Sequence, residues 1–308
     1  MTAALTGTTA AFGALLTATL FWAGNYVVGG AAVSAIPPLD LVALRWAIAV
    51  IPLLALAQLV ERPDWRHVAR SWHRVLFPAL FGLVAYNYLL YTALQYTDAV
   101  NASLINAFNP ALIGVAAAIF LRQRMTPTAV TGVIVALVGV LWVLCDGHPT
   151  ALLSNGFGLG DVFMLGAIVV WTAYTLSGRR RTGIPPVTST AIQALVSLIA
   201  LTPVVLLTGG PHLPVTSNAT TALLFIGLCP SVISTALWNR ALTTIPPARA
   251  GVFLNLITVF TVLISVALGK SFTVAEAMGG AVVLGGVVMT NAPAFRGGRA
   301  RSDARVSR

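Results

Sequence analysis

Polar and aromatic side chains interrupt the apolar segments of this sequence, and their types suit the binding of a small charged molecule. A guanidinium group pairs with a carboxylate, amides offer hydrogen bonds, and indole or phenol rings attract an ammonium group or stack on an apolar side chain. Because such groups are costly in hydrocarbon, we expect them to face the interior or a water-filled cavity. The candidate binding residues are Trp22, Asn25, Tyr26, Arg45, Asn87, Tyr91, Asn106, Trp171, Tyr174, Trp238 and Asn239.

The same residues also have structural interpretations. Buried amides and hydroxyls commonly hydrogen-bond between membrane helices, at about 0.6 kcal/mol each on average. Aromatic side chains gather at the membrane interface, and four others fit such a belt: Trp46, Trp65, Trp72 and Tyr96. Arg45 can extend outward to the interface or pair with an acid at the outer helix ends, where three are expected: Asp40, Asp98 and Asp161.

Residue types and motifs that are missing from the sequence exclude several classes of function. No Asp or Glu lies in the middle of any of them, and an exchanger of protons for cationic drugs depends on such an acid. The four histidines fall in loops or at helix ends, which leaves no expected group of nucleophile, acid and base. The phosphate-binding pattern GxxxxGK(S/T) does not occur, and the two cysteines have no metal-ligand spacing. We therefore expect no enzyme activity, no cofactor and no bound metal.

The segments that carry the candidate residues are typical of a membrane protein. Of 308 residues, 57% are hydrophobic and 8% are charged, whereas about 25% are charged in a soluble domain. Apolar runs of about 20 residues, long enough to span a bilayer, predict an all-α polytopic membrane protein. Breaking these runs at Pro, Gly and Arg clusters predicts ten transmembrane helices, near residues 8–30, 39–60, 73–95, 101–121, 127–145, 159–178, 187–207, 220–242, 249–269 and 273–292.

The basic residues predict the orientation of these helices. With the amino terminus inside, 16 of the 18 Lys and Arg residues fall on the cytoplasmic side, as expected for a multi-pass inner (plasma) membrane protein. Both termini are then cytoplasmic, in agreement with an even number of crossings. This distribution accounts for the net charge of +10 without a nucleic-acid partner. The expected partners are the lipid bilayer and a small-molecule substrate, and the chain is expected to be a monomer.

The two halves of the chain share a weak internal repeat. Trp22 matches Trp171, and Ile36-Pro-Pro38 matches Ile184-Pro-Pro186. The predicted units are residues 8–145 and 146–292, followed by a disordered basic cytoplasmic tail at residues 293–308. Because each unit holds five helices, the second must be inserted in the opposite direction. Inverted repeats of this kind place a substrate site between the units and operate by alternating access.

The stretch Phe21-Trp-Ala-Gly-Asn25, with Pro37, Pro38 and Arg45 after it, resembles the start of an EamA-type domain of the drug/metabolite transporter superfamily. Residues 160–171 look like the start of a second copy. The paired tryptophans and the Asn- and Tyr-rich interior are most similar to those of YddG-type amino-acid exporters. The resemblance implies a secondary transporter that exports small metabolites, above all aromatic and other neutral amino acids. An exporter of other metabolites or drugs, such as purines or sugars, is the alternative, and a pore is a more remote one.

Overall fold

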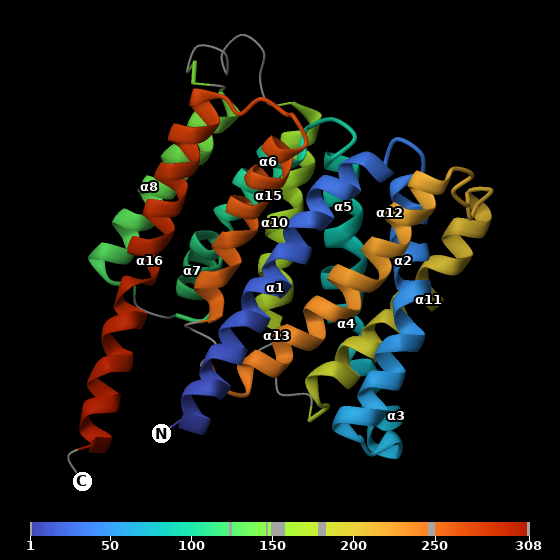
Figure 1. Ribbon diagram of the computed structural model, residues 1–308, viewed down its shortest axis with the longest axis horizontal. Helices are drawn as coiled ribbons and strands as arrows, with labels where there is room; N and C mark the ends of the chain where they lie inside the picture. The colour runs from blue at the N-terminus through green and yellow to red at the C-terminus, as the bar shows by residue number, and fades with distance from the viewer. Residues whose placement is uncertain are drawn as a thin grey trace.

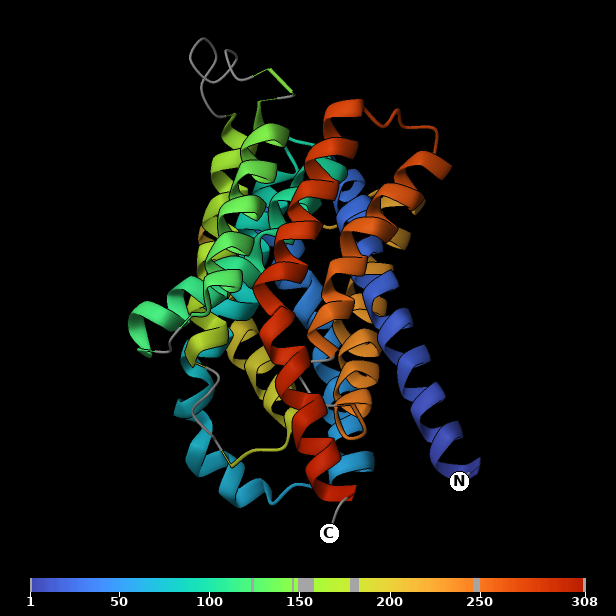
Figure 2. The same cartoon turned by 90° about the vertical axis from the view of Figure 1, so that its left-hand side faces the viewer.

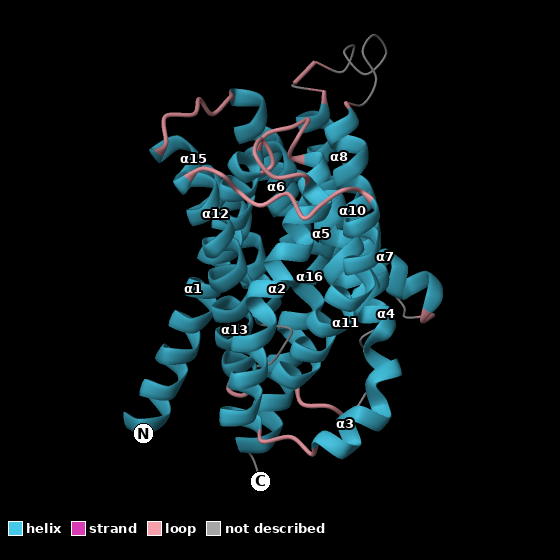
Figure 3. Ribbon diagram, turned by 90° about the vertical axis from the view of Figure 1, so that its right-hand side faces the viewer, coloured by secondary structure: helices cyan, strands magenta, loops and turns pink. Residues whose placement is uncertain are grey.

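The computed structural model describes residues 2–122, 125–145, 147–148, 158–177, 183–245 and 250–306. Within these ranges every regular element is a helix, as the sequence predicts (Figures 1 and 3). The first half comprises α1 (Thr2–Ala32), α2 (Pro38–Leu56), η1 (Ala57–Glu61), α3 (Trp65–Ser71), η2 (Trp72–Val75), α4 (Leu76–Pro78), η3 (Ala79–Ala85), α5 (Tyr86–Ala93), α6 (Ala99–Ala107), α7 (Asn109–Phe120) and α8 (Pro127–Leu144). The second half comprises α10 (Leu159–Ser177), α11 (Pro186–Leu207), α12 (Ser217–Leu228), η4 (Cys229–Ile233), α13 (Ser234–Leu242), η5 (Gly251–Asn255), α15 (Leu256–Ala267) and α16 (Val274–Val306).

Eight helical segments of the described ranges are long and apolar enough to cross a membrane. They agree with the first eight predicted helices, except that the third begins at Trp65 rather than at residue 73. The apolar helices that correspond to the ninth and tenth, Phe253–Ala267 and Val274–Thr290, are shorter. The chain is therefore an integral membrane protein. Within the described ranges eight helices are long enough to span the membrane, and the count of ten crossings stays a prediction.

The second, third and eighth of these segments each contain a π-helical stretch that the sequence did not predict: η1, η3 and η4. The stretch η3 follows Pro78, and η4 contains Pro230. Because proline supplies no backbone N–H and displaces the preceding turn, it breaks the regular hydrogen-bond ladder of an α-helix. The wider π-turns leave carbonyl groups available to side chains, and such turns occur frequently at functional sites.

Helices from the two halves of the chain pack against one another in a reciprocal pattern. Helix α2 packs on α11, and α8 packs on α16 (Figure 1). Helix α1 contacts α13 and α15, whereas α10 contacts α5 and α7. The main hydrophobic core contains side chains from both halves. The halves therefore share one interior, in which the candidates Tyr26 and Tyr91 lie.

Glycines allow α8 and α16 to approach until their backbones are in contact (Figure 2). A Cβ atom added to Gly132 would lie 2.6 Å from the carbonyl oxygen of Gly286, and one added to Gly286 would lie 2.3 Å from the backbone nitrogen of Ala136. Nearer the other end of the pair, a Cβ atom on Gly139 would lie 2.8 Å from the carbonyl oxygen of Gly279. Small residues promote such close packing between helices in membranes.

Carboxylates connect α2 and α11 at both ends of the pair. At one end, Glu61 accepts hydrogen bonds from the backbone nitrogens of Val187 at 2.8 Å and Thr188 at 2.7 Å. The position of this negative charge at the start of α11 is favourable for the helix dipole. At the other end, Asp40 Oδ2 accepts a hydrogen bond from the backbone nitrogen of His212 at 3.0 Å and lies 2.6 Å from its Nδ1.

The last helix begins as its sequence indicates but ends later than predicted. Thr273 Oγ1 accepts a hydrogen bond from the backbone nitrogen of Glu276 at 3.1 Å, and Glu276 Oε2 accepts one from the backbone nitrogen of Thr273 at 2.7 Å. This arrangement is a capping box. The sequence predicted disorder from residue 293, whereas α16 continues to Val306. Extending an existing helix costs far less than starting one, and the Ala and Arg residues of this segment are good helix formers.

Candidate substrate site

Arg45, in the first half of α2, is a buried cation held by neutral side chains. Its side chain is 5% exposed. The Nε atom donates a hydrogen bond to Ser231 Oγ at 2.7 Å, and Nη1 donates to Asn87 Oδ1 at 2.6 Å and to the Tyr91 hydroxyl at 2.8 Å. Ser231 belongs to η4, whereas Asn87 and Tyr91 lie on α5. The guanidinium group therefore bridges the two halves of the chain.

Asn25 on α1 completes this group, which we name the central polar cluster: Asn25, Arg45, Asn87, Tyr91 and Ser231. The Tyr91 hydroxyl donates a hydrogen bond to Asn25 Oδ1 at 2.8 Å, and Arg45 Nη1 lies 3.5 Å from the same oxygen. All five residues are buried. Four of them are among the candidates from the sequence. Ser231 is not, although its helical spacing from Thr235 and Trp238 on one polar stripe is the signal that could have found it.

Among the residues that the structure describes, no carboxylate pairs with Arg45. Asp40 instead bonds His212, Asp98 accepts a hydrogen bond from the backbone of Asn101, and Asp161 accepts one from the Asn101 side chain. The interpretations of Arg45 as an ion-pair partner or as an outward-extending side chain are therefore wrong. A buried charge without a counter-ion is strongly unfavourable unless hydrogen bonds or a bound anion compensate it. The site can thus accept an anionic group.

Carbonyl groups near the π-helical stretches orient the acceptors of the cluster toward Arg45. Asn87 Nδ2 donates a hydrogen bond to Leu83 O at 2.8 Å, which turns Asn87 Oδ1 toward the guanidinium group. Ser231 Oγ donates to Ile226 O at 2.7 Å, so its lone pairs remain available to Arg45 Nε. The polar interior is thus arranged before any ligand binds.

A row of aromatic rings lies beside the cluster. The hydroxyls of Tyr26 and Tyr86 are 3.2 Å apart. The Tyr86 ring centroid lies 4.7 Å from that of Trp171, which lies 4.9 Å from that of Tyr174. We call Tyr26, Tyr86, Trp171 and Tyr174 the aromatic row. Three of its members were predicted, and Tyr86 was missed, although it directly precedes the predicted Asn87. Gly82 gives Tyr174 its space, since a Cβ atom there would lie 2.5 Å from the Tyr174 ring.

Trp22 and Trp238 form a separate indole pair with centroids 5.2 Å apart. Trp22 Nε1 donates a hydrogen bond to Pro230 O at 3.0 Å, which connects α1 to η4 one residue before Ser231. Trp46 also points inward: it is 4% exposed, donates to Leu83 O at 3.1 Å, and its ring centroid lies 4.9 Å from Arg45 Cζ. The assignment of Trp46 to an interfacial belt is therefore wrong. Trp65, Trp72 and Tyr96, in contrast, are exposed, as a belt requires.

The remaining candidates, Asn106 and Asn239, lie outside these groups. Asn106 is half-buried on α6, and its Oδ1 atom has no hydrogen-bond partner. Asn239 is half-buried on α13, at the repeat position of Tyr91. Neither contacts the central polar cluster through a hydrogen bond. The candidates thus divide into a cluster, a row, an indole pair and two separate amides.

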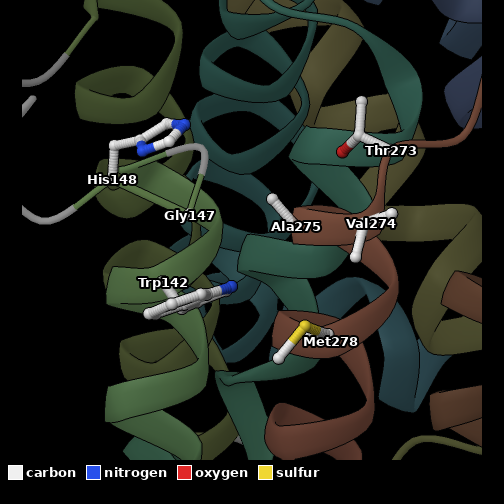
Figure 4. A pocket seen from close by; sticks show the side chains of 7 residues that line it. All are labelled: Trp142, Gly147, His148, Thr273, Val274, Ala275 and Met278. Carbon is white, nitrogen blue, oxygen red and sulfur yellow. The ribbon is translucent and has the colours of Figure 1, made fainter.

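Two cavities in the described ranges lie away from the candidate residues. One, of about 360 Å³, lies where α8 ends and α16 begins, and Figure 4 shows the side chains of Trp142 and Met278 on its opposite sides. The other, of about 330 Å³, lies between α3 and α11. Because the members of the central polar cluster are buried and bond to one another, the candidate site is closed in this structure.

A bundle of apolar helices around a hydrogen-bonded buried cation is an architecture that suits a membrane transporter. The EamA-like transporter family matches residues 9–145 and, a second time, residues 158–292. The chain therefore belongs to this family, within the drug/metabolite transporter superfamily. The resemblance found in the sequence is confirmed.

Several relatives and one solved structure are similar to this chain. The uncharacterized transporter YyaM of Bacillus subtilis (strain 168) is 26% identical over 280 residues, which are 89% of this chain and 91% of YyaM. A probable terminal-alkyne amino-acid exporter of Streptantibioticus cattleyicolor is 27% identical over 237 residues, 75% of this chain and 76% of the relative. The aromatic amino acid exporter YddG of Ancylobacter novellus is 25% identical over 175 residues, 55% of this chain and 58% of YddG. A crystal structure with 22% identity and a TM-score of 0.64 covers 92% of this chain and 97% of its own, and so shares the fold.

Proposed function

We propose that this transporter exports neutral amino acids, aromatic ones above all, and that Arg45 binds the substrate carboxylate. One observation carries the proposal: Arg45 is buried, and in the described part of the chain it bonds only neutral groups and has no carboxylate as counter-ion. A guanidinium group presents paired N–H donors that match a carboxylate, so the substrate can supply the missing negative charge.

The aromatic row supports the preference for aromatic substrates. Its rings can stack on an apolar or aromatic side chain and attract the ammonium group of a zwitterion. Because π faces and hydroxyls can stabilise the ammonium group, the site can bind a zwitterion without a buried Asp or Glu. Two of the relatives described above are named as amino-acid exporters, which agrees with this choice of substrate.

The proposed architecture is ten membrane crossings in two inverted five-helix repeats. The protein would lie in the inner (plasma) membrane, with both termini in the cytoplasm. The reciprocal packing of the two halves supports the repeat, because an exchange of the halves converts the α1–α13 contact into the α10–α5 contact. The two family matches support it as well. Transport would then proceed by alternating access, with the closed site as one state of the cycle.

Competition in proteoliposomes tests the substrate and the role of Arg45. The purified protein is reconstituted, and uptake of radiolabelled phenylalanine is measured against unlabelled phenylalanine, phenylpropionate and phenylethylamine. We expect phenylalanine to compete best, phenylpropionate to compete partially, and phenylethylamine, which lacks the carboxylate, to compete at least about tenfold more weakly (1.4 kcal/mol). Arg45→Gln should abolish the difference in competition between phenylpropionate and phenylethylamine.

The control variant is Arg240→Gln, which removes an exposed arginine at the end of α13. It should leave the order of competitors unchanged. If phenylethylamine competes as well as phenylalanine, Arg45 does not bind a substrate carboxylate. Competition by adenine or glucose, but by no amino acid, would favour the alternative exporters. Flux that does not saturate would indicate a pore.

A further inference from the structure

An apolar groove lies between the short helix α3 and the membrane-spanning helix α11, at the end of the bundle where α1 begins (Figures 1 and 3). Its volume is about 330 Å³. The lining consists of apolar and aromatic side chains, four from the segment around α3 and four from α11: Trp65, Val68, Ala69, Trp72, Ile192, Leu195, Val196 and Ile199. None of them takes part in the candidate substrate site.

The sequence of α3 places this apolar face at the level of a membrane surface. Trp65, Val68 and Trp72 are spaced three and four residues apart and so form one stripe. The two tryptophans are 39% and 50% exposed, respectively. Trp65 Nε1 donates a hydrogen bond to Gln58 Oε1 at 2.8 Å, which fixes its ring at the groove. Tryptophan is enriched where lipid acyl chains meet headgroups.

Positive charge flanks the groove. Arg66 and Arg70 are four residues apart on the stripe of α3 next to Ala69, and both are exposed. The two carboxylates nearest in the sequence bond other groups: Asp64 accepts hydrogen bonds from the backbone at the start of α3, and Glu61 accepts three from the start of α11. The guanidinium groups of Arg66 and Arg70 are therefore available to an external anion.

We propose that this groove binds one phospholipid with an anionic headgroup, whose acyl chain lies between α3 and α11 and whose phosphate contacts Arg66 and Arg70. The apolar lining suits an acyl chain, and the adjacent arginines complement a net negative headgroup rather than a zwitterionic one. Basic residues near a membrane surface each contribute about 1 kcal/mol of attraction to anionic lipids. The predicted orientation puts this end on the cytoplasmic side, where Lys and Arg residues are concentrated.

Native mass spectrometry of the purified protein tests the proposal, with dioleoyl phosphatidylglycerol and dioleoyl phosphatidylcholine added separately in detergent. The wild type should retain phosphatidylglycerol with at least about tenfold higher affinity than phosphatidylcholine. Arg66→Gln combined with Arg70→Gln should abolish that preference. Trp72→Ala should weaken the binding of both lipids, because it shortens the apolar wall.

The matched control combines Arg122→Gln with Arg240→Gln, which removes two other exposed arginines. If the groove is the site, this control variant should change the preference for phosphatidylglycerol over phosphatidylcholine by less than twofold. Equal affinity for both lipids in the wild type would overturn the proposal, as would an equal loss in the control double variant. Displacement of phosphatidylglycerol by millimolar inorganic phosphate would also overturn it, since the site would then recognise phosphate without a lipid. Size-exclusion profiles establish that each variant is folded.

Discussion

Thr188 donates both its backbone N–H and its hydroxyl to the same carboxylate oxygen of Glu61, each at 2.7 Å. The two residues lie far apart in the sequence and connect the first turn of α11 to the end of η1. Together with the contact between Asp40 and His212, in the loop that follows α11, this bond connects the two ends of the helix pair. We therefore expect the two helices to move as one unit during transport.

Replacement of Glu61 by alanine should destabilise the protein by about 1–3 kcal/mol, because it leaves three donors of α11 without their acceptor. Glu61→Gln should cost less, since it retains one acceptor oxygen. The measurement is the thermal unfolding midpoint in detergent. Glu276→Ala is the control, because the half-buried Glu276 caps α16 within its own first turn. An equal fall in the midpoint for both alanine variants would show that the contact across α2 and α11 adds nothing beyond capping.

Replacement of Asn25 by aspartate should raise the thermal midpoint and lower the transport of phenylalanine. The new carboxylate would lie about where Asn25 Oδ1 lies, 3.5 Å from Arg45 Nη1, and would act as a counter-ion to the guanidinium group. It would then compete with the substrate carboxylate for the guanidinium group. Asn25→Leu, which removes the acceptor without adding charge, should lower the midpoint instead. Wild-type transport by the aspartate variant would contradict the assignment of Arg45 as the anchor of the substrate.

Two adjacent glycines of α16 should respond oppositely to alanine. Gly286→Ala places a methyl group 2.3 Å from the backbone nitrogen of Ala136, so α8 and α16 must separate at a cost of about 1–3 kcal/mol or more. Gly285→Ala meets no atom within 4 Å and should be neutral or stabilising, because alanine favours helix. Thermal unfolding of both variants is the measurement. Equal midpoints would show that the backbone contact between the helices can relax freely.

Replacement of Trp22 and of Trp171 by phenylalanine should separate two effects on transport. Trp22→Phe removes the donor to Pro230 O, next to Ser231 in η4, and should raise the KM for phenylalanine and for leucine equally. Trp171→Phe shrinks a ring of the aromatic row and should raise the KM for phenylalanine more than that for leucine. Identical KM ratios in both variants would mean that the aromatic row does not select the substrate side chain.

Much of the helical architecture could be predicted from the sequence, because apolar length and helix-cap residues are local properties. The cap at Thr126 and the capping box at Thr273 lie where their residues indicate. The interior position of Arg45, Asn87 and Tyr91 also followed from the cost of placing such groups in lipid.

The partners of these residues could not be predicted, because a sequence gives the depth of a residue along its helix but not the neighbours it faces. Asp40 was a reasonable partner for Arg45 by depth, yet it faces the loop that contains His212. Trp46 directly follows Arg45, and only the rotation of α2 decides that its ring lies inside. The π-helical stretches could not be predicted either, because π-helices are too rare for a local sequence pattern to indicate them.

The backbone contact between α8 and α16 has a consequence for how such a chain can diverge. A methyl group at Gly132, Gly139 or Gly286 collides with the backbone of the opposite helix rather than with a movable side chain. A single substitution of one of these glycines would therefore force α8 and α16 apart, unless residues on the opposite helix change as well. We therefore expect Gly132, Gly139 and Gly286 to change less among related chains than Gly285, whose added Cβ atom would meet no atom within 4 Å.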